Sequence, residues 1–303
     1  MYDDRILPAR LPRPAKKEGN ETTMGKIYMR FPQGRAKALT LSYDDGVEQD
    51  IRLISILRKN GLKGTFNLNS GLYAPEGFRY PAGDVHRVMS ARQARELYLD
   101  SGMEVAVHAL THPDLTLLPQ NICTREILRD RENLERQFGC IVRGMAYPYG
   151  TYNDAVVDVL RQCGIVYART VHSTEGFALP QDWLRLCATC HHGNPRLMEL
   201  ARKFTEAAPM RAPILFYLWG HSYEFEQQDN WDVIEVFSEY MSRRDDIWYA
   251  TNLEIYEYTE DFHRLVFSMD ETIVQNPTNR DLFFLYGDTL VTAKPGTTVL
   301  PQP

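Results

Sequence analysis

Short apolar runs alternate with longer amphipathic segments from Lys37 to about residue 252. The strand-length apolar runs cover residues 38–43, 63–68, 103–108, 142–147, 165–169, 184–189, 213–219 and 248–251. Most intervening segments carry apolar residues at helical spacing, namely 49–59, 90–100, 119–138, 153–162, 195–207 and 231–241. Repeated strand-then-helix units predict a parallel sheet with crossover helices.

The number and spacing of these units favour a barrel. About seven units in about 220 residues fit a closed or nearly closed (β/α) barrel better than an open doubly wound sheet. No glycine-rich phosphate loop follows the first predicted strand, so the sequence does not favour a nucleotide site. The expected fold class is therefore α/β, a distorted (β/α) barrel of about seven strands.

The pattern changes after Phe262. Short alternating segments separated by turn residues lie at 265–269, 272–275, 282–285 and 290–293, and they predict a small β-rich appendage. At the other end, residues 1–23 are polar and proline-bearing, and the chain after Met24 resembles a natural start. We therefore expect a flexible N-terminal arm (1–23), the barrel (24–262) and a C-terminal β-rich extension (263–303).

Composition narrows the classes of partner. The 303 residues carry 34 lysines and arginines against 40 aspartates and glutamates, a net charge of −6. This charge gives no footprint for nucleic acid or an anionic membrane surface. Five cysteines cannot all pair internally, and no apolar run is long enough to span a bilayer or serve as a secretion signal. We expect a cytoplasmic protein with no nucleic-acid or membrane partner, with a homo-oligomer left open.

Polar side chains with chemical potential follow several predicted strands. Asp44 and Asp45 follow the first strand, His108 and His112 the third, Pro148–Gly150 the fourth, and His221 the apolar strand 213–219. In a parallel barrel, reactive side chains gather at the carboxyl ends of the strands. These residues are therefore candidates for one shared site.

The spacing within this set is compatible with a metal site. Adjacent carboxylates point in opposite directions if the backbone stays extended, so one can bind a metal while the other faces substrate. Two histidines four residues apart can meet one ion across a tight turn. One aspartate and two histidines leave positions open for water and substrate, as a catalytic site requires. Taken singly, an Asp-Asp-Gly sequence is usually a turn and an H-x-x-x-H pair is usually structural.

The motifs together resemble those of the polysaccharide deacetylases, which belong to carbohydrate esterase family four and remove acetyl groups from N-acetylated sugars. Residues 41–46 (LSYDDG) resemble the family's T-F-D-D-G motif, and residues 108–112 (HALTH) resemble its H-S/T-x-x-H motif. Residues 146–150 (AYPYG) are similar to R-x-P-Y-G, and residues 218–221 (LWGH) to L-x-x-H. The motifs occur in family order between about residues 38 and 252.

The resemblance implies a metal centre and a general base. Asp45, His108 and His112 would hold one divalent metal, usually zinc and sometimes cobalt or nickel. Asp44 would be the base that takes a proton from the attacking water. A metal and fixed hydrogen-bond donors stabilise charge that develops only in the transition state.

The resemblance also implies roles on the substrate side. The backbone N–H of Tyr149 would stabilise the oxyanion, and His221 would protonate the departing amine. Leu218 would line the pocket for the acyl methyl group, and Pro148 would be a further substrate-binding residue.

Two departures from the family pattern concern residues that tune the catalytic groups. The arginine of R-x-P-Y-G is Ala146 here, and Arg169 or Arg143 is a candidate to supply the missing guanidinium. The fourth family motif is poorly matched. Asp182 and Trp183 are candidates for its roles, with Asp182 setting the charge of His221 and Trp183 walling the pocket.

Other polar residues allow two interpretations each. Asn67 and Asn69 follow the second predicted strand, where they could bind substrate or act as turn caps. The C-x-x-C pair Cys187 and Cys190 lacks a second pair, so it is more typical of core packing than of a metal or redox site. His191 and His192 follow a predicted strand and could reach the cleft, and nearby tyrosines and tryptophans could stack on sugar rings.

Three functions remain open. The leading hypothesis is a metal-dependent hydrolase of C–N amide bonds that deacetylates an N-acetylated sugar or oligosaccharide. The second is a hydrolase of a small cyclic amide or imide, similar to the allantoinase-like branch of the superfamily. The third is a non-catalytic carbohydrate-binding relic, against which the intact set of aspartates and histidines argues.

Overall fold

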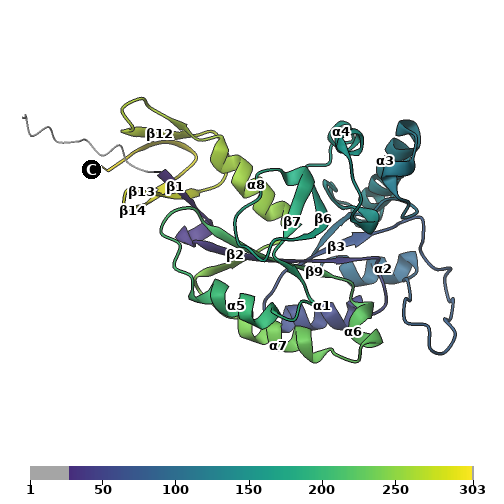
Figure 1. Cartoon of the computed structure of the whole chain (residues 1–303). Coiled ribbons are helices and arrows are strands. Elements are labelled where there is room, and N and C mark those ends of the chain that lie inside the picture. Colours follow the sequence, from purple (N-terminus) through teal and green to yellow (C-terminus); the bar gives the residue numbers. More distant parts are fainter. Residues whose placement is uncertain (1–26, 302–303) are drawn as a thin grey trace, which may run out of the picture.

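The computed structural model describes residues 27–301, so the predicted arm of residues 1–23 lies outside the described residues. Figure 1 shows a central sheet flanked by helices, with a separate group of short strands near the C-terminus. No helix among the described residues is long and apolar enough to cross a membrane.

Parallel strands form the central sheet. They are β2 (Lys37–Asp44), β3 (Thr65–Leu68), β4 (Glu104–Val107), β5 (Gly144–Ala146), β6 (Tyr167–Ser173), β7 (Leu186–Ala188), β8 (Cys190–His191), β9 (Ile214–Gly220) and β10 (Ile247–Tyr249). Their spatial order is β7-β6-β5-β4-β3-β2-β9-β8, and β10 pairs with β2. This is the expected α/β class, a distorted barrel, and the short strand β8 has no counterpart among the predicted apolar runs.

Strand β2 is the centre of the sheet. Its last residues, Ser42–Asp44, pair with β3, while its first residues, Lys37–Leu39, pair with β10. Its other edge pairs with β9 along seven residues, from Lys37 to Tyr43. The carboxyl end of β2 is thus fixed from both sides, which gives its terminal aspartate a defined place.

Most helices cover the outer face of the sheet. They are α1 (Asp50–Lys59), α2 (Ala91–Tyr98), α3 (Gln120–Phe138), α4 (Asp154–Gln162), α5 (Leu197–Glu206), α6 (Tyr223–Gln227) and α7 (Asp232–Met241). Helix α8 (Asn252–His263) packs instead in a second core cluster, which contains Tyr217 and Trp219 of β9. Alternate strand residues such as Leu39, Phe216 and Leu218 pack with apolar residues of the helices in the main core. Ser90 is the N-cap of α2 and forms a capping box with Gln93.

The inner face of the sheet carries hydrogen-bonded polar residues. The hydroxyl of Thr40 and that of Tyr217 both bond the buried amide of Asn252 at the start of α8. Glu104 accepts hydrogen bonds from Thr65 and Tyr167. Because buried polar groups need partners, this network fixes the positions of the strands beneath the site.

The C-terminal region forms two small sheets rather than the single small sheet expected. One contains β1 (Ile27–Arg30), β13 (Leu282–Tyr286) and β14 (Thr289–Ala293), and the other contains β11 (Val266–Phe267), β12 (Ile273–Asn276) and β15 (Gly296–Val299). Strand β1 therefore pairs with the C-terminal extension, although it belongs to the segment predicted as barrel.

Helix α8 was not predicted, although its start carries a sequence signal. Thr251 and Glu254 form a capping box, a pattern recognisable as T-x-x-E. The short helix α6 and the two-residue strand β8 were also missed. Neither is long enough to carry a periodic pattern.

Candidate active site

The two aspartates at the end of β2 leave the strand in different conformations. Asp44 is the last residue of the extended strand and is buried. Asp45 has a φ of 78°, a left-handed conformation that side-chain-bearing residues rarely adopt. The backbone is therefore not extended at Asp45, although an extended backbone was the condition for carboxylates that point in opposite directions. Both lie near the His108 ring, with Asp45 Oδ1 3.6 Å and Asp44 Oδ2 3.8 Å from His108 Nε2.

A tight loop after β4 brings His108 and His112 together. His112 has a φ of 54°, and the two imidazole ring centroids are 4.7 Å apart. The amide of Asn69 donates to the Ala109 carbonyl at 2.7 Å. The buried carboxylate of Glu126 accepts from Thr111 at 2.9 Å. These buried partners hold a loop that its backbone conformation alone would not favour.

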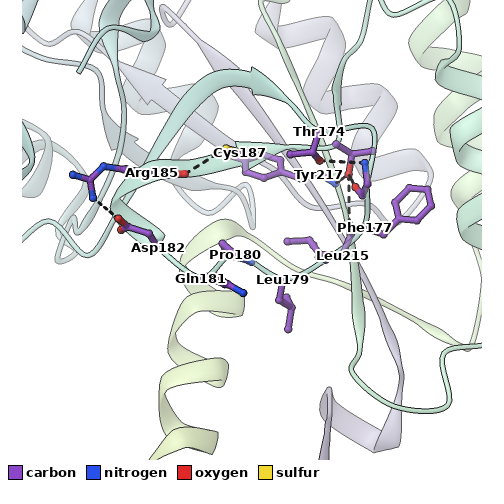
Figure 2. Close-up of a pocket in the computed structure, with 13 residues that line it drawn as sticks. Thr174, Phe177, Leu179, Pro180, Gln181, Asp182, Arg185, Cys187, Leu215 and Tyr217 are labelled. Carbon is purple, nitrogen blue, oxygen red and sulfur yellow. Dashed lines mark hydrogen bonds and ion pairs between the residues drawn. The ribbon is translucent and has the colours of Figure 1, made fainter. Parts of the chain in front are cut away.

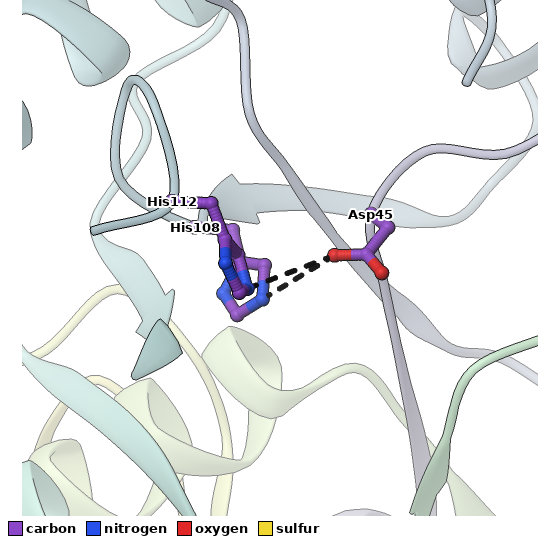
Figure 3. Close-up of side chains that lie close together, drawn as sticks. All are labelled: Asp45, His108 and His112. Atoms are coloured by element: carbon purple, nitrogen blue, oxygen red, sulfur yellow. Dashed lines mark ion pairs between the residues drawn. The ribbon is translucent and has the colours of Figure 1, made fainter. Parts of the chain in front are cut away.

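Asp45, His108 and His112 form what we call the Asp45 cluster (Figure 3). Asp45 Oδ1 lies 3.6 Å from His108 Nε2 and 3.9 Å from His112 Nε2. One ligand atom from each residue lies within 4.8 Å of the other two. These separations exceed hydrogen-bond lengths, so lone pairs face a common space.

The chemistry of the Asp45 cluster fits a divalent transition metal. In a tetrahedral site with bonds of about 2.1 Å, ligand atoms are about 3.4 Å apart, close to the distances found here. His108 Nδ1 is 2.8 Å from the Ala146 carbonyl, and donation there leaves Nε2 free as a ligand. Burial lowers the pKa of His112, which favours the neutral imidazole that a metal requires.

His86 contacts the outer oxygen of Asp45 and was not anticipated from the sequence. It lies in the long loop between β3 and α2, and its Nε2 is 3.1 Å from Asp45 Oδ2. Burial favours a raised pKa for Asp45, but the His86 hydrogen bond and the charge of His108 outweigh it and lower the pKa. His86 follows a stretch of sequence without a strand pattern, so no sequence pattern could have identified it as a site residue.

Asp44 is held by two partners. Its Oδ2 forms an ion pair with Arg169, and its Oδ1 accepts from the Asn67 amide at 2.8 Å. Burial alone favours a raised pKa for Asp44, but the charges of Arg169, His108 and His221 outweigh it and lower the pKa. Asp44 is therefore kept ionised although only 2% of its surface is exposed.

Arg169 contacts Asp44 from β6, the strand next to the one that carries Ala146 in place of the family arginine. Ala146 on β5 is the register partner of Arg169 on β6. The Arg169 guanidinium also stacks on the Trp219 ring at 4.5 Å and is buried. The contact predicted for Arg169 is present. Arg143, the other candidate, lies 3.9 Å from Glu257 of α8 instead.

His221 follows β9 and contacts two carboxylates. Its Nε2 lies 3.8 Å from Asp44 Oδ2, and its Nδ1 is hydrogen-bonded to Glu224 Oε1 at 3.1 Å. Burial favours a lowered pKa for His221, but the Glu224 hydrogen bond and the charges of Asp44 and Asp45 outweigh it and raise the pKa. Glu224 was not predicted, although its position three residues after a candidate histidine is a local signal.

Tyr149 lies on the rim of the Asp45 cluster. It has a φ of 56° within the turn Pro148–Gly150, and its ring meets the His112 ring edge to face at 4.6 Å. The Tyr149 side chain is 66% exposed, whereas Pro148 is buried. The turn predicted to stabilise an oxyanion therefore lies next to the candidate metal ligands.

Two residues predicted to bind substrate are in other places. Leu218 has no exposed surface and packs in the core between sheet and helices, so it does not line an open pocket. Asn67 is also fully buried, and its amide nitrogen contacts Ser42 and Asp44. Strand alternation explains both corrections, because it turns Leu218 outward and Asn67 toward Asp44.

Asp182 does not have the partner predicted for it. Its carboxylate pairs with Arg185 and caps the turn at Leu184, while Glu224 contacts His221. Trp183 packs edge to face on Tyr256 of α8 at 5.3 Å, so it is not a wall beside His221.

Asp182 and Arg185 instead line a different pocket (Figure 2). This cavity of about 280 Å³ lies between the chain segment 174–182 and strands β7 and β9. None of the candidate catalytic or metal-binding residues lines it. Cys187 lies in this lining, whereas Cys190 is buried, and both thiols are free.

Comparison with known proteins identifies a family for part of the chain. The polysaccharide deacetylase family model matches residues 32–168. The matched segment contains Asp44, Asp45, His108, His112 and the turn Pro148–Gly150, and it ends before Arg169 and His221. The family resemblance is confirmed for the motifs within this segment, whereas residues 218–221 lie beyond it.

Relatives were found in sequence and in structure. An uncharacterized protein of Streptomyces coelicolor is 27% identical over 125 residues, which are 41% of this chain and 44% of the relative. The chain thus matches less than half the length of this curated relative. A Mycobacterium smegmatis protein described as a polysaccharide deacetylase has a TM-score of 0.54 at 17% identity, covering 78% of this chain and 94% of that one. A family 4 carbohydrate esterase from Streptomyces lividans has a TM-score of 0.45 at 18% identity, covering 68% and 88%. The M. smegmatis likeness supports the fold alone.

Proposed function

Because residues 32–168 carry a polysaccharide deacetylase domain, we propose that this protein is a metal-dependent hydrolase that removes the acetyl group from an N-acetylated sugar or oligosaccharide. The observation that carries the proposal is the position of Asp44. Its Oδ2 lies 3.8 Å from His108 Nε2 and 3.8 Å from His221 Nε2. A buried carboxylate between a candidate metal ligand and a candidate acid fits the base of an amide hydrolase.

Asp45, His108 and His112 would hold the divalent ion, for which zinc is our first candidate and cobalt or nickel the alternatives. Such an ion supplies Lewis acidity, lowering the pKa of water toward about 7 and polarising a carbonyl oxygen. His86 would orient the Asp45 carboxylate through its outer oxygen, since 3.1 Å separates the two groups.

The remaining residues would move protons and stabilise charge. Asp44 accepts the proton of the water that attacks the acetyl carbonyl, and Arg169 and Asn67 keep its carboxylate fixed. The backbone N–H of Tyr149 donates to the oxygen on which negative charge develops. His221 then donates a proton to the departing amine nitrogen, a step that a raised pKa favours.

The test is acetate release from N-acetylated chitooligosaccharides compared with ring opening of a panel of cyclic amides and imides. We expect acetate release that stops after chelation and returns with zinc. Ring opening without acetate release would favour the cyclic-amide hydrolase. Binding of the oligosaccharide without turnover, at full metal occupancy, would favour the carbohydrate-binding relic.

The variant His221→Ala adds a test of the acid. Sugar amines are poor leaving groups and need a proton, whereas the aryl oxide of an activated aryl acetate departs without one. We expect the variant to lose far more activity on the sugar amide than on the aryl ester. Equal losses on both substrates would exclude His221 as the acid.

A further inference from the structure

Glu224 contacts three histidines, and only His221 among them has a place in the proposed reaction. We call His191, His192, His221 and Glu224 the Glu224 cluster. Glu224 Oε1 is hydrogen-bonded to His221 Nδ1 at 3.1 Å. Glu224 Oε2 lies 3.1 Å from His191 Nε2 and 2.9 Å from His192 Nε2.

The surroundings of Glu224 favour its ionised form. Burial alone favours a raised pKa for Glu224, but the contacts with the three histidines outweigh it and lower the pKa. Burial lowers the pKa of His192 to about 4, so this ring is neutral, and its Nε2 lies 2.9 Å from Glu224 Oε2. One oxygen of the Glu224 carboxylate thus lies beside the neutral, buried ring of His192, and the other is hydrogen-bonded to His221.

Packing fixes His192, and through it Glu224. The His192 ring stacks on Phe225 with centroids 4.1 Å apart. A Cβ at Gly220 would lie 2.1 Å from His192 Nδ1, so only glycine leaves space for this ring. Gly220, immediately before His221, is therefore required because the His192 ring, which contacts Glu224, fills the space of a side chain.

We propose that Glu224 is the positioning residue of His221: it holds the imidazole through Nδ1, so that Nε2 faces Asp44 and the leaving nitrogen of the substrate. This inference rests on the proposed function for the role of His221 as an acid, although the orientation of the ring can be measured without turnover. Donation from Nδ1 leaves the Nε2 position of the charged ring to carry the proton that is transferred.

Charged and titratable groups face His221 from three elements of the structure. Asp44 and Asp45 face it from the end of β2, and Glu224 and Tyr223 face it from α6. The His191 ring faces it from the end of β8, with centroids 6.5 Å apart, and His192 lies next to His191. Glu224 is the group that makes a hydrogen bond to Nδ1, so its charge is the one to remove.

The experiment compares the wild-type protein, loaded with zinc, with Glu224→Gln by nitrogen NMR of labelled histidine rings. The His221 signals are identified by their loss in His221→Ala. In wild type we expect the neutral ring to carry its proton on Nδ1. Removing an adjacent charge should lower the pKa of His221 by about one unit or more. An unchanged His221 titration in Glu224→Gln would overturn the proposal.

Glu226→Gln is the matched control. Glu226 lies two residues away in the same helix and pairs with Arg87 rather than with a histidine. The His221 titration should be unchanged in this variant. An equal shift in both variants would mean that the helix, not the Glu224 carboxylate, sets the state of His221, and would also overturn the proposal.

Kinetics and metal content complete the test. In Glu224→Gln, the fall in the rate of sugar-amide hydrolysis at high pH should begin about one pH unit lower than in wild type, while aryl acetate hydrolysis should be affected much less. Two zinc ions per wild-type chain, with one lost in Glu224→Gln, would make the Glu224 cluster a metal site and overturn the proposal. A protein inactive on every amide, in which Glu224 still sets the state of His221, would refute the proposed function and leave the positioning role intact.

Discussion

Two clusters of histidine and carboxylate adjoin Asp44, and they differ in spacing. In the Asp45 cluster the carboxylate oxygen lies 3.6 and 3.9 Å from the imidazole nitrogens. In the Glu224 cluster the corresponding distances are 2.9 and 3.1 Å. The first distances suit atoms that share a metal ion, and the second suit hydrogen bonds.

Residue types alone therefore do not determine the chemistry of a site. Both clusters consist of one carboxylate and neighbouring histidines at the carboxyl ends of strands. In the Asp45 cluster, His108 donates its other nitrogen to a backbone carbonyl, so Nε2 remains a free ligand. In the Glu224 cluster, His221 Nδ1 is hydrogen-bonded to Glu224 Oε1, so a proton lies between these two atoms.

The largest expected effect concerns Arg169, which forms an ion pair with Asp44, the aspartate that adjoins both clusters. Arg169→Met leaves the buried Asp44 charge unpaired, which should cost about 3–5 kcal/mol in the free energy of unfolding. Urea denaturation measures this loss. Arg185→Met is the control, because the partly exposed pair of Arg185 with Asp182 should contribute about 1 kcal/mol or less. Equal losses in the two variants would show that the Asp44 pair has no special role.

The second prediction tests the Asp45 cluster as the metal site. His112→Ala removes one of the three proposed protein ligands. Zinc-binding free energies of about 10–16 kcal/mol in four-ligand sites imply a loss of about 10²- to 10³-fold in affinity. Elemental analysis and competition with a chelator measure it. His191→Ala should leave the metal affinity unchanged, and full occupancy in His112→Ala would refute the assignment.

The third prediction separates catalysis from metal binding. Asp44→Asn keeps the size of the side chain but removes its basicity, so turnover should fall by about 10²-fold or more. Metal content should be unchanged, because Asp45 rather than Asp44 is the proposed ligand. If the variant loses its metal, the two aspartates have exchanged roles.

The fourth and smallest effect concerns the anchor of the segment that carries His221. Asp50 accepts hydrogen bonds from Ser222 at 2.6 Å and Tyr98 at 2.5 Å. Burial raises the pKa of Asp50 from 3.8 to about 7. Between these values the folded state binds one proton more than the unfolded state, so the stability that this group contributes is present below about pH 4 and is lost as the pH rises to about 7.

Asp50→Asn should remove this dependence. Between pH 5 and pH 6.5, the wild type should lose about 2 kcal/mol of stability relative to the variant, at 1.36 kcal/mol per pH unit. Denaturant unfolding of both proteins at the two pH values measures the difference. Parallel stability curves would mean that Asp50 is already ionised in the folded protein.

Most regular elements were predictable because their pattern is local. The alternation of apolar runs and amphipathic segments identified β2, β9 and the main helices within a few residues. The pairing of β1 with β13 was not predictable, since it joins segments more than 250 residues apart. The same holds for β10, whose pairing with β2 depends on the path of the whole chain.

By itself, the sequence determined the fold class and which aspartates and histidines end at one edge of the sheet. Strand periodicity and motif order suffice for this, because parallel strands present their carboxyl ends together. Only the tertiary structure decided how these side chains combine. The left-handed backbone of Asp45 placed its carboxylate near His108, and the neighbouring strand supplied Arg169 beside Ala146. Glu224, not Asp182, reached His221. These outcomes depend on distances between residues remote in sequence, and packing sets those distances.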